Sequence, residues 1–294
     1  MGIVTDTSQR WTVGNATITS IVEDEMLHIP PEFFFPEATA AVVASHDWVI
    51  PDFADADGNV GLRTQALIVE HAGRTVLVDP CVGNHKHLAQ FFWDQQEWPF
   101  MERFLAAGFT TDAVDTVLHT HVHADHVGWD THLVDDAWVP TFTNARHLYT
   151  AGEMEFARAT IDHPQMVHVF HESIEPIINA GLADIVEADA NLGHGMRLES
   201  TPGHTPGHVS MWLESKGEQA LITGDFLHHP VQCAEPLWSE TGDADADVAR
   251  ASRQRMLATA AETGVLFIGT HFPNRPAGRV QVDGDVWRFV PEPK

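Results

Sequence analysis

The residues best suited to chemistry lie close together in one short stretch. Residues 121–126 read H-x-H-x-D-H, with His121, His123, Asp125 and His126 as the polar members. Side chains alternate at the end of a strand, so His121 and His123 can point to the same side. Where the chain then turns into a helix, Asp125 and His126 can point to a second place. The spacing therefore predicts two neighbouring metal positions served by one loop.

Imidazole and carboxylate groups suit Zn²⁺, and they also suit iron, manganese or cobalt. A single histidine near an apolar strand is usually a buried residue with ordinary hydrogen-bond partners. Three histidines and an aspartate at this spacing would be costly to bury unpaired, and a metal ion removes that cost. We therefore expect two divalent metal ions, with zinc as the first choice.

The segments around the motif are expected to mix strands with helices, which predicts an α/β or α+β fold. Short apolar runs between turn residues indicate the strands, and longer periodic runs indicate the helices. The expected strands are 11–22, 64–71, 75–78, 114–118, 145–148, 185–188, 196–200, 208–213, 220–223 and 265–269. The expected helices are 99–109, 151–160 and 245–263.

Residues 24–60 differ from the rest because they combine four prolines, an acidic patch and the aromatic run Phe33-Phe34-Phe35. We expect an irregular excursion here within one domain that covers residues 1–294. The aromatic run fits the core, the cap of a substrate pocket or a subunit contact. A homodimer is the assembly most common for a chain of this size.

The composition excludes several classes of function. The formal net charge is −26, which repels phosphate backbones, so nucleic acid is not an expected partner. No run of 18 apolar residues is present, so no membrane span is expected. The polar N-terminus predicts no secretion signal, and Cys81 and Cys233 have no paired spacing, so we expect a cytoplasmic protein.

Four further stretches accompany the motif in a particular order. They are Leu77-Val78-Asp79, the run TPGHTPGH at 201–208, Leu221-Ile222-Thr223-Gly224-Asp225 and Phe267-Ile268-Gly269-Thr270-His271. Together with H-x-H-x-D-H, they resemble the metallo-β-lactamase superfamily over about residues 64–275. The resemblance implies a four-layered αβ/βα sandwich with its metal ions at one edge.

The resemblance also implies a division of the ligands. One metal ion would take His121, His123 and His204, the other would take Asp125, His126 and His271, and Asp225 would bridge the two. Asp79 would support the loops that carry these ligands. Two such ions can polarise a substrate oxygen and lower the pKa of a bound water, so no serine or cysteine nucleophile is needed. Asp125 could also orient that water.

Asp225 narrows the choice of branch. A bridging carboxylate is typical of the glyoxalase II, lactonase and phosphotriesterase-like branches, whereas true β-lactamases of this fold lack it. The chain leaves no length for a flavodoxin-like domain, and its charge opposes a nuclease. The basic C-terminus of glyoxalase II is not evident. Residues 128–131 and 138–146 resemble the group of quorum-quenching lactonases and methyl-parathion-hydrolase-like enzymes.

We therefore predict a dinuclear metal-dependent hydrolase of lactones or esters, with a small molecule like an N-acyl homoserine lactone as substrate. Related lactonases carry a tyrosine three residues after the bridging aspartate, and here His228 occupies that position. Because histidine can also donate to an oxyanion, the expected catalytic residues are Asp125, Asp225 and His228. The alternatives are an organophosphate triesterase or arylesterase and, outside enzymes, a metal-binding sensor. The intact ligand set argues against the sensor.

Three other histidines have open roles. His119 is expected to be structural or to support the ligands, and His208 to brace its loop through hydrogen bonds. His229, like His228, follows Asp225 closely and is a candidate for contact with the substrate.

Overall fold

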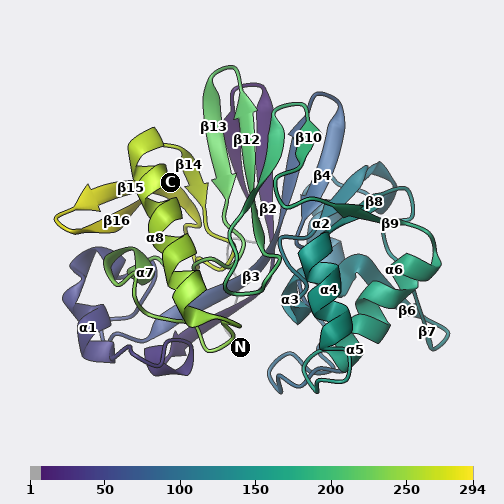
Figure 1. Cartoon of the computed structure of the whole chain (residues 1–294), viewed down its shortest axis with the longest axis horizontal. Helices are drawn as coiled ribbons and strands as arrows, with labels where there is room; N and C mark the ends of the chain where they lie inside the picture. Colours follow the sequence, from purple (N-terminus) through teal and green to yellow (C-terminus); the bar gives the residue numbers. More distant parts are fainter. Residues whose placement is uncertain (1–7, 294) are drawn as a thin grey trace. The chain divides into compact units, whose positions relative to one another are not determined.

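The computed structural model describes residues 8–293, which form two compact units. Unit 1 comprises residues 25–63 and 191–293, and unit 2 comprises residues 8–24 and 64–190. Each unit contains candidate ligands and is described by itself. Figure 1 shows the course of the chain, which passes from one unit to the other within the long strands β2 and β3 and again at residues 190–191.

Unit 2 is built on a seven-stranded sheet with the order β1-β2-β3-β4-β5-β8-β9. Strands β1–β2 and β3–β4 pair antiparallel, whereas β4, β5, β8 and β9 run parallel. The bounds are β1 (Ser8–Val13), β2 (Ala16–Ile29), β3 (Val60–His71), β4 (Arg74–Val78), β5 (Thr116–Leu118), β8 (Arg146–Thr150) and β9 (Ala183–Val186).

Turn residues explain the hairpin between β3 and β4. Ala72 and Gly73 connect the strands with φ angles of 51° and 76°. Two successive positive φ angles match the twist of an antiparallel pair, and glycine accepts such an angle without a steric cost. The expected hairpins at 11–22 and 64–78 are both confirmed.

The helices of unit 2 follow its parallel strands. They are α2 (Phe100–Ala106), α3 (Ala124–Val127), α4 (Ala151–Ala159), α5 (Val167–Val169), a π-helical turn η5 (Phe170–Ile174) and α6 (Glu175–Asn179), with 3₁₀ turns η3 (Thr111–Ala113) and η4 (Gly128–Asp130). Helix α4 packs against β8 and β9. It begins where the Thr150 side chain accepts a hydrogen bond from the Glu153 amide, a standard N-terminal cap. A separate hairpin joins β6 (Thr131–Val134) to β7 (Ala137–Pro140).

Unit 1 has its own seven-stranded sheet, in the order β10-β11-β12-β13-β14-β15-β16. The bounds are β10 (Asn191–Gly193), β11 (Met196–Ser200), β12 (Val209–Ser215), β13 (Glu218–Ile222), β14 (Leu266–Ile268), β15 (Ala277–Asp283) and β16 (Val286–Pro291). The helices are α1 (Ala40–Ser45), α7 (Val231–Ala234) and α8 (Ala246–Thr263), with 3₁₀ turns η1 (Pro31–Phe33) and η2 (Asp47–Val49).

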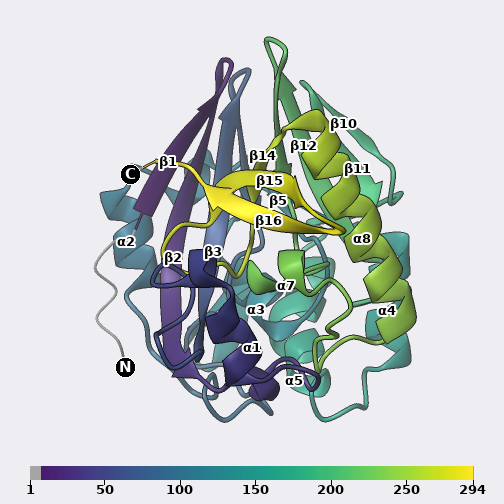
Figure 2. The same ribbon diagram turned by 90° about the vertical axis from the view of Figure 1, so that its left-hand side faces the viewer.

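Helix α8 is the longest helix among residues 8–293, and it packs against β15 (Figures 1 and 2). Asp245 caps its start by accepting hydrogen bonds from the amides of Asp247 and Val248. Gly264 ends it with a φ of 62°, one residue after the end of the expected helix 245–263.

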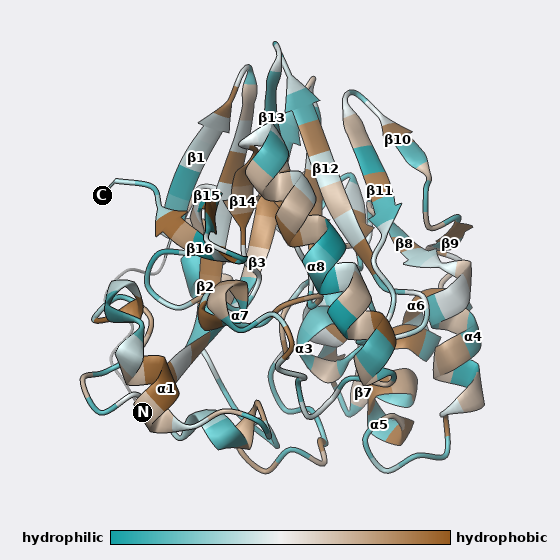
Figure 3. Ribbon diagram, turned by 60° about the vertical axis from the view of Figure 1, so that its left-hand side comes forward, coloured by the Kyte–Doolittle hydropathy of each residue, from teal (hydrophilic) through white to brown (hydrophobic). Residues whose placement is uncertain are grey.

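Each unit has a separate apolar core. In unit 1, Leu221, Phe226, Met256 and Phe267 belong to one buried cluster, and Figure 3 colours β14 as hydrophobic. In unit 2, a second cluster includes Leu77, Val117, Phe100, Phe104 and Trp129. The strand ends that carry the polar motifs are therefore anchored in well-packed interiors.

The structure confirms the mixed α/β class with two large sheets, but it corrects one expectation. Residues 24–60 are only partly irregular, because β2 continues through Ile29 beside β3 and Thr39 caps helix α1. The β6–β7 and β15–β16 hairpins and the helices of 167–179 were not anticipated. That residues 1–294 make a single domain stays a prediction. Among residues 8–293, no helix has both the length and the hydropathy of a membrane span.

Candidate metal centre

In unit 2, the four polar residues of H-x-H-x-D-H lie together, His121 and His123 in the turn after β5 and Asp125 and His126 in α3. The ring of His121 has its centroid 4.7 Å from that of His123 and 3.9 Å from that of His126. Asp125 Oδ2 lies 3.5 Å from His126 Nε2. His121 and His126 are fully buried. The motif thus gathers three imidazoles and a carboxylate at one strand end, as the spacing predicted.

Asp79 holds this cluster from the end of β4. Its Oδ1 accepts a hydrogen bond from the Thr120 amide at 2.8 Å, and its Oδ2 accepts one from the Thr120 hydroxyl at 2.7 Å. The same Oδ2 lies 3.0 Å from His126 Nδ1. From α4, Glu153 accepts a hydrogen bond from the Val122 amide at 3.0 Å. Buried carboxylates from two elements therefore fix the turn that carries the motif.

In unit 1, three imidazoles surround one carboxylate oxygen. Asp225 Oδ2 lies 3.1 Å from His271 Nε2, 3.2 Å from His228 Nε2 and 3.5 Å from His204 Nε2. All four side chains are buried. His204 follows β11, Asp225 follows β13 and His271 follows β14, so three strand ends of one sheet supply the group.

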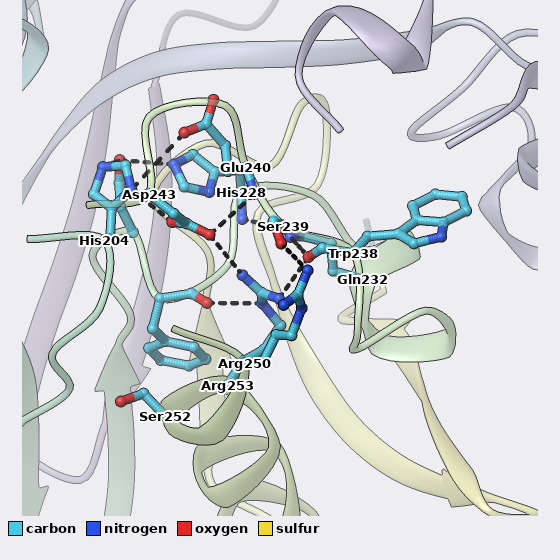
Figure 4. A network of polar contacts seen from close by, with 12 residues as sticks. His204, His228, Gln232, Trp238, Ser239, Glu240, Asp243, Arg250, Ser252 and Arg253 are labelled. Carbon is cyan, nitrogen blue, oxygen red and sulfur yellow. Dashed lines mark hydrogen bonds and ion pairs between the residues drawn. The ribbon is translucent and has the colours of Figure 1, made fainter. Parts of the chain in front are cut away.

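A network of polar contacts orients His204 through Nδ1, the ring nitrogen that does not face Asp225 (Figure 4). Its Nδ1 bonds to Asp243 Oδ1 at 3.1 Å, and Asp243 Oδ2 lies 3.6 Å from the guanidinium of Arg253 in α8. Arg253 is fully buried, and it donates hydrogen bonds to the carbonyls of Phe226 at 2.9 Å and Trp238 at 2.6 Å. The sequence analysis missed Asp243 and Arg253, because neither forms part of a motif.

This network shifts the pKa values of His204 and Asp243 in opposite directions. Burial lowers the pKa of the His204 imidazole, but its hydrogen bond to Asp243 and the nearby Asp225 and Glu240 carboxylates raise the pKa above its usual value overall. Burial raises the pKa of Asp243, but the hydrogen bond and positive charge of His204 bring it below its usual range. Asp243 is therefore an ionised acceptor that orients the His204 ring.

His208 and His228 occupy distinct positions around Asp225. His208 Nε2 accepts a hydrogen bond from the Asp225 amide at 2.7 Å, and its Nδ1 lies 2.8 Å from the Thr201 hydroxyl. His208 thus braces its loop, as the sequence analysis expected. The His228 ring lies parallel to the His271 ring at 5.6 Å, and its amide donates to Gln232 Oε1 at 2.7 Å.

His229 faces the interior of unit 1. Its Nε2 lies 2.9 Å from the Phe53 carbonyl, and its Nδ1 accepts a hydrogen bond from the Val231 amide at 3.1 Å. Burial lowers its pKa to about 4, so the ring is neutral. Both ring nitrogens have partners within the protein, which opposes the substrate contact considered for His229.

His119 belongs to a separate buried cluster in unit 2. Asp130 Oδ2 lies 2.9 Å from His119 Nε2 and accepts a hydrogen bond from the Tyr149 hydroxyl at 2.8 Å. Asp130 Oδ1 lies 3.0 Å from His147 Nδ1. Burial raises the pKa of Asp130, but the two imidazoles hold it well below its usual range. The sequence analysis did not recognise this cluster, which forms because His119 follows β5 and His147 lies in the neighbouring parallel strand β8.

The chemistry of these donors fits a divalent transition metal. Histidine ligands usually bind through one ring nitrogen while the other bonds to a carboxylate, hydroxyl or carbonyl. Three candidate ligands show such a hydrogen-bond partner at Nδ1: Thr120 Oγ1 for His121 at 3.1 Å, Asp243 for His204 and the Arg63 carbonyl for His271 at 2.8 Å. For His126, Nδ1 lies 3.0 Å from the Asp79 carboxylate as an ion pair. Nε2 is then the nitrogen through which each ring can bind an ion, and imidazole with carboxylate suits Zn²⁺.

The chain is similar in sequence and in fold to known proteins. N-acyl homoserine lactonase AiiA of Bacillus thuringiensis subsp. kurstaki is 28% identical over 115 residues, which cover 39% of each chain. Two solved structures match nearly the whole fold. AidC, described as a dizinc quorum-quenching lactonase, has a TM-score of 0.79 at 20% identity, and hydrolase AbOPH has one of 0.81 at 23% identity; each comparison covers 98% of both chains.

The matching stretches span between about two fifths and three fifths of the length of the first curated relatives. The family assignment has wider coverage, since residues 60–284 match the metallo-beta-lactamase superfamily. That region includes the strands from β3 to β15 and all seven candidate ligands. By its fold, its motifs and this match, the chain belongs to the metallo-β-lactamase superfamily.

Proposed function

We propose that the chain is a metal-dependent hydrolase whose two clusters supply the ligands of one dinuclear centre. His121, His123 and His204 would hold one ion, Asp125, His126 and His271 the other, and Asp225 both. The observation that carries the proposal is the convergence of three buried imidazoles on Asp225 Oδ2 within 3.5 Å. Such a group is costly to bury unless a cation shares its charge.

The ions, with Zn²⁺ preferred, would supply Lewis acidity and lower the pKa of a water ligand. The protein's own residues provide the rest of the site. Asp225 is fixed through its backbone by His208, so its carboxylate keeps one orientation. Asp125 lies at the start of α3 beside His126, where it can accept a proton from the attacking water.

His228 would contact the substrate. It lies 3.2 Å from Asp225 Oδ2 through Nε2, and its backbone is fixed by Gln232. Its Nδ1 is buried and has no hydrogen-bond partner among residues 8–293. A protonated nitrogen in such a place can donate to the oxygen that becomes negative when an ester or lactone carbonyl is attacked.

We assign lactones of the N-acyl homoserine type as the first substrate class, supported by the similarity to AiiA. A second candidate is an aryl ester or an organophosphate triester. His228 favours it, since it stands where related lactonases have tyrosine. Both reactions place negative charge on an oxygen near the metal ions, so the same residues serve either substrate.

A panel of substrates tests the proposal. Initial rates are measured on N-hexanoyl homoserine lactone, γ-butyrolactone, an aryl acetate, paraoxon and a chromogenic β-lactam, each with and without a chelator. We expect chelator-sensitive turnover that is fastest with the acyl homoserine lactone. Faster turnover of paraoxon or the aryl ester would select the second candidate. No turnover of any substrate by protein that holds two metal ions would contradict the proposed hydrolase.

A further inference from the structure

A second set of metal-binding residue types lies in unit 2, outside the candidate centre. His87, His168 and Glu172 each offer one ligand atom, and these three atoms lie within 4.8 Å of one another. We propose that His87, His168 and Glu172 form an additional binding site for a divalent cation, with Zn²⁺ as the best match. Two imidazoles and one carboxylate are a known ligand set for zinc sites that keep an open position.

The two imidazoles converge on one oxygen atom. His87 Nδ1 lies 2.8 Å and His168 Nδ1 lies 3.0 Å from Glu172 Oε1. The two rings are 5.3 Å apart between centroids. Ligand atoms in a tetrahedral zinc site are about 3.3 Å apart, given metal–ligand distances near 2.0 Å. The two nitrogen–oxygen distances would each lengthen by a few tenths of an ångström if an ion took the place of the two imidazole protons.

The backbone presents these residues in a fixed way. His168 in α5 and Glu172 in η5 are four residues apart, so their side chains lie on the same side of the helical segment. The turn at Phe170–Ile174 is π-helical, a form that is rare and often found at functional sites. His87 comes from a different segment, so an ion would link the loop after β4 to this helical segment.

Hydrogen bonds fix both the side-chain carboxylate and the backbone carbonyl of Glu172. Its Oε2 accepts a hydrogen bond from the His87 amide at 3.0 Å, and its carbonyl accepts one from Lys86 Nζ at 3.0 Å. The Thr131 hydroxyl donates to the same carbonyl. Because these contacts already order the carboxylate, little conformational freedom would be lost when an ion binds.

Exposure and charge favour entry of a cation. The Glu172 side chain is 9% exposed, whereas the side chains of His87 and His168 are 59% and 51% exposed. An ion can therefore approach from solvent and still meet a largely desolvated carboxylate. The net charge of −26 raises the local concentration of cations around the protein.

The same region offers a matched control. His171 and Glu175 are also four residues apart, with Nδ1 2.8 Å from Oε2 and side chains 49% and 44% exposed. This pair has the spacing of His168 and Glu172, and the exposure of its histidine is close to that of His168. Its carboxylate is much more exposed than that of Glu172, so it should hold a cation less well.

The test uses the full-length protein with its resident metal ions bound and Zn²⁺ as the probe. Equilibrium dialysis and elemental analysis give the zinc bound per chain for wild type, His87→Ala/His168→Ala and His171→Ala. We expect wild type and His171→Ala to bind one more ion than the double variant, and added Zn²⁺ to raise the Tm of those two proteins only. Circular dichroism checks that the double variant is folded.

Equal zinc binding by all three folded proteins would overturn the proposal, because the histidines would then be mere hydrogen-bond partners of Glu172. Loss of the extra ion in His171→Ala, with retention in the double variant, would also overturn it by moving the site to the neighbouring pair. Should the double variant fail to fold, His168→Gln replaces it. Glutamine keeps a hydrogen-bond donor but removes the imidazole nitrogen, so we expect at least a tenfold loss of zinc affinity.

Discussion

The two units present their candidate ligands in different ways. In unit 2, four candidate ligands lie within six consecutive positions, in the turn after β5 and the first residues of α3, so one short segment places them all. In unit 1, His204, Asp225 and His271 come from three strand ends, and Asp243 and Arg253 support His204 from outside any motif. A contiguous cluster depends on one local turn, whereas a dispersed cluster depends on the packing of a whole sheet. We expect unit 1 to be the more sensitive to changes remote from the ligands.

The largest effect is expected at the one carboxylate that three imidazoles of unit 1 share. Asp225→Asn keeps the size and shape of the side chain but removes its negative charge. We expect the rate of lactone hydrolysis to fall by about 10³-fold, equivalent to roughly 4 kcal/mol of transition-state stabilisation. Steady-state kinetics with elemental analysis measure it. An unchanged rate would exclude Asp225 from the centre, and the comparison between the units would lose its main support.

The support behind His204 should matter for folding. Arg253→Met would leave the Asp243 carboxylate buried without its cation and several carbonyls without their donor. Removing one member of a buried pair typically costs about 3–5 kcal/mol of unfolding free energy. Urea denaturation measures the loss. In unit 2, Arg146→Met is the control, since its pair with Asp184 is exposed and should contribute little. Similar losses in the two variants would contradict the comparison.

A matched pair of substitutions compares the carboxylates behind the ligands. Asp243→Asn in unit 1 and Asp79→Asn in unit 2 each remove a charge that faces a histidine Nδ1. Loss of such a partner typically lowers metal affinity or activity about 10–100-fold. We expect the larger loss of affinity for Asp243→Asn. In Asp79→Asn, the side-chain oxygen that remains can still accept the hydrogen bond from the Thr120 amide, so the loop that carries His121 stays fixed. Competition with a chromophoric chelator measures the affinities. A larger loss for Asp79→Asn would reverse the order proposed here.

The smallest effect concerns pH and a lysine in unit 2. Burial lowers the pKa of Lys86 from 10.5 to about 7, despite the opposing effect of the Glu172 and Asp130 carboxylates. Between pH 7 and 10 the unfolded chain binds this proton and the folded protein does not, so stability rises with pH. This contribution of Lys86 to the unfolding free energy is present at high pH and is lost as pH falls through about 7.

Lys86→Met should remove this dependence. As pH rises from 7 to 9.5, the unfolding free energy of wild type should therefore increase relative to that of Lys86→Met. Urea denaturation at both pH values measures it, and exposed Lys216→Met is the control. A difference that does not change with pH would show that Lys86 stays charged in the folded protein.

The same contrast explains what the sequence revealed. Motifs with regular spacing, such as 121–126 and the strand-end residues His204, Asp225 and His271, could be recognised because chemistry restricts both residue type and position. Most strands and helices with clear periodicity were also confirmed. Asp243 and Arg253 could not be found, since their role depends on how α8 packs. The Asp130 cluster was missed for the same reason, because neighbouring strands assemble it.

Residues 24–60 show a further limit. Prolines and a run of phenylalanines suggested irregular structure for the whole segment, but the first of these residues is Pro30, and β2 runs to Ile29 alongside β3 before it. Where a strand ends depends on its pairing with a neighbouring strand, which local composition does not describe. Phe35 is fully buried, whereas Phe33 is 49% exposed, so the aromatic run itself serves more than one environment.

The most direct test of the proposed centre follows the hydrolysis of one lactone as metal is removed and returned. The protein is stripped with a chelator, its metal content is measured, and Zn²⁺ is added back in known equivalents while the rate on N-hexanoyl homoserine lactone is recorded. We predict no turnover without metal and a rate that rises until two equivalents are bound by the two clusters. Full turnover by metal-free protein, or a rate that ignores the added ion, would contradict the account.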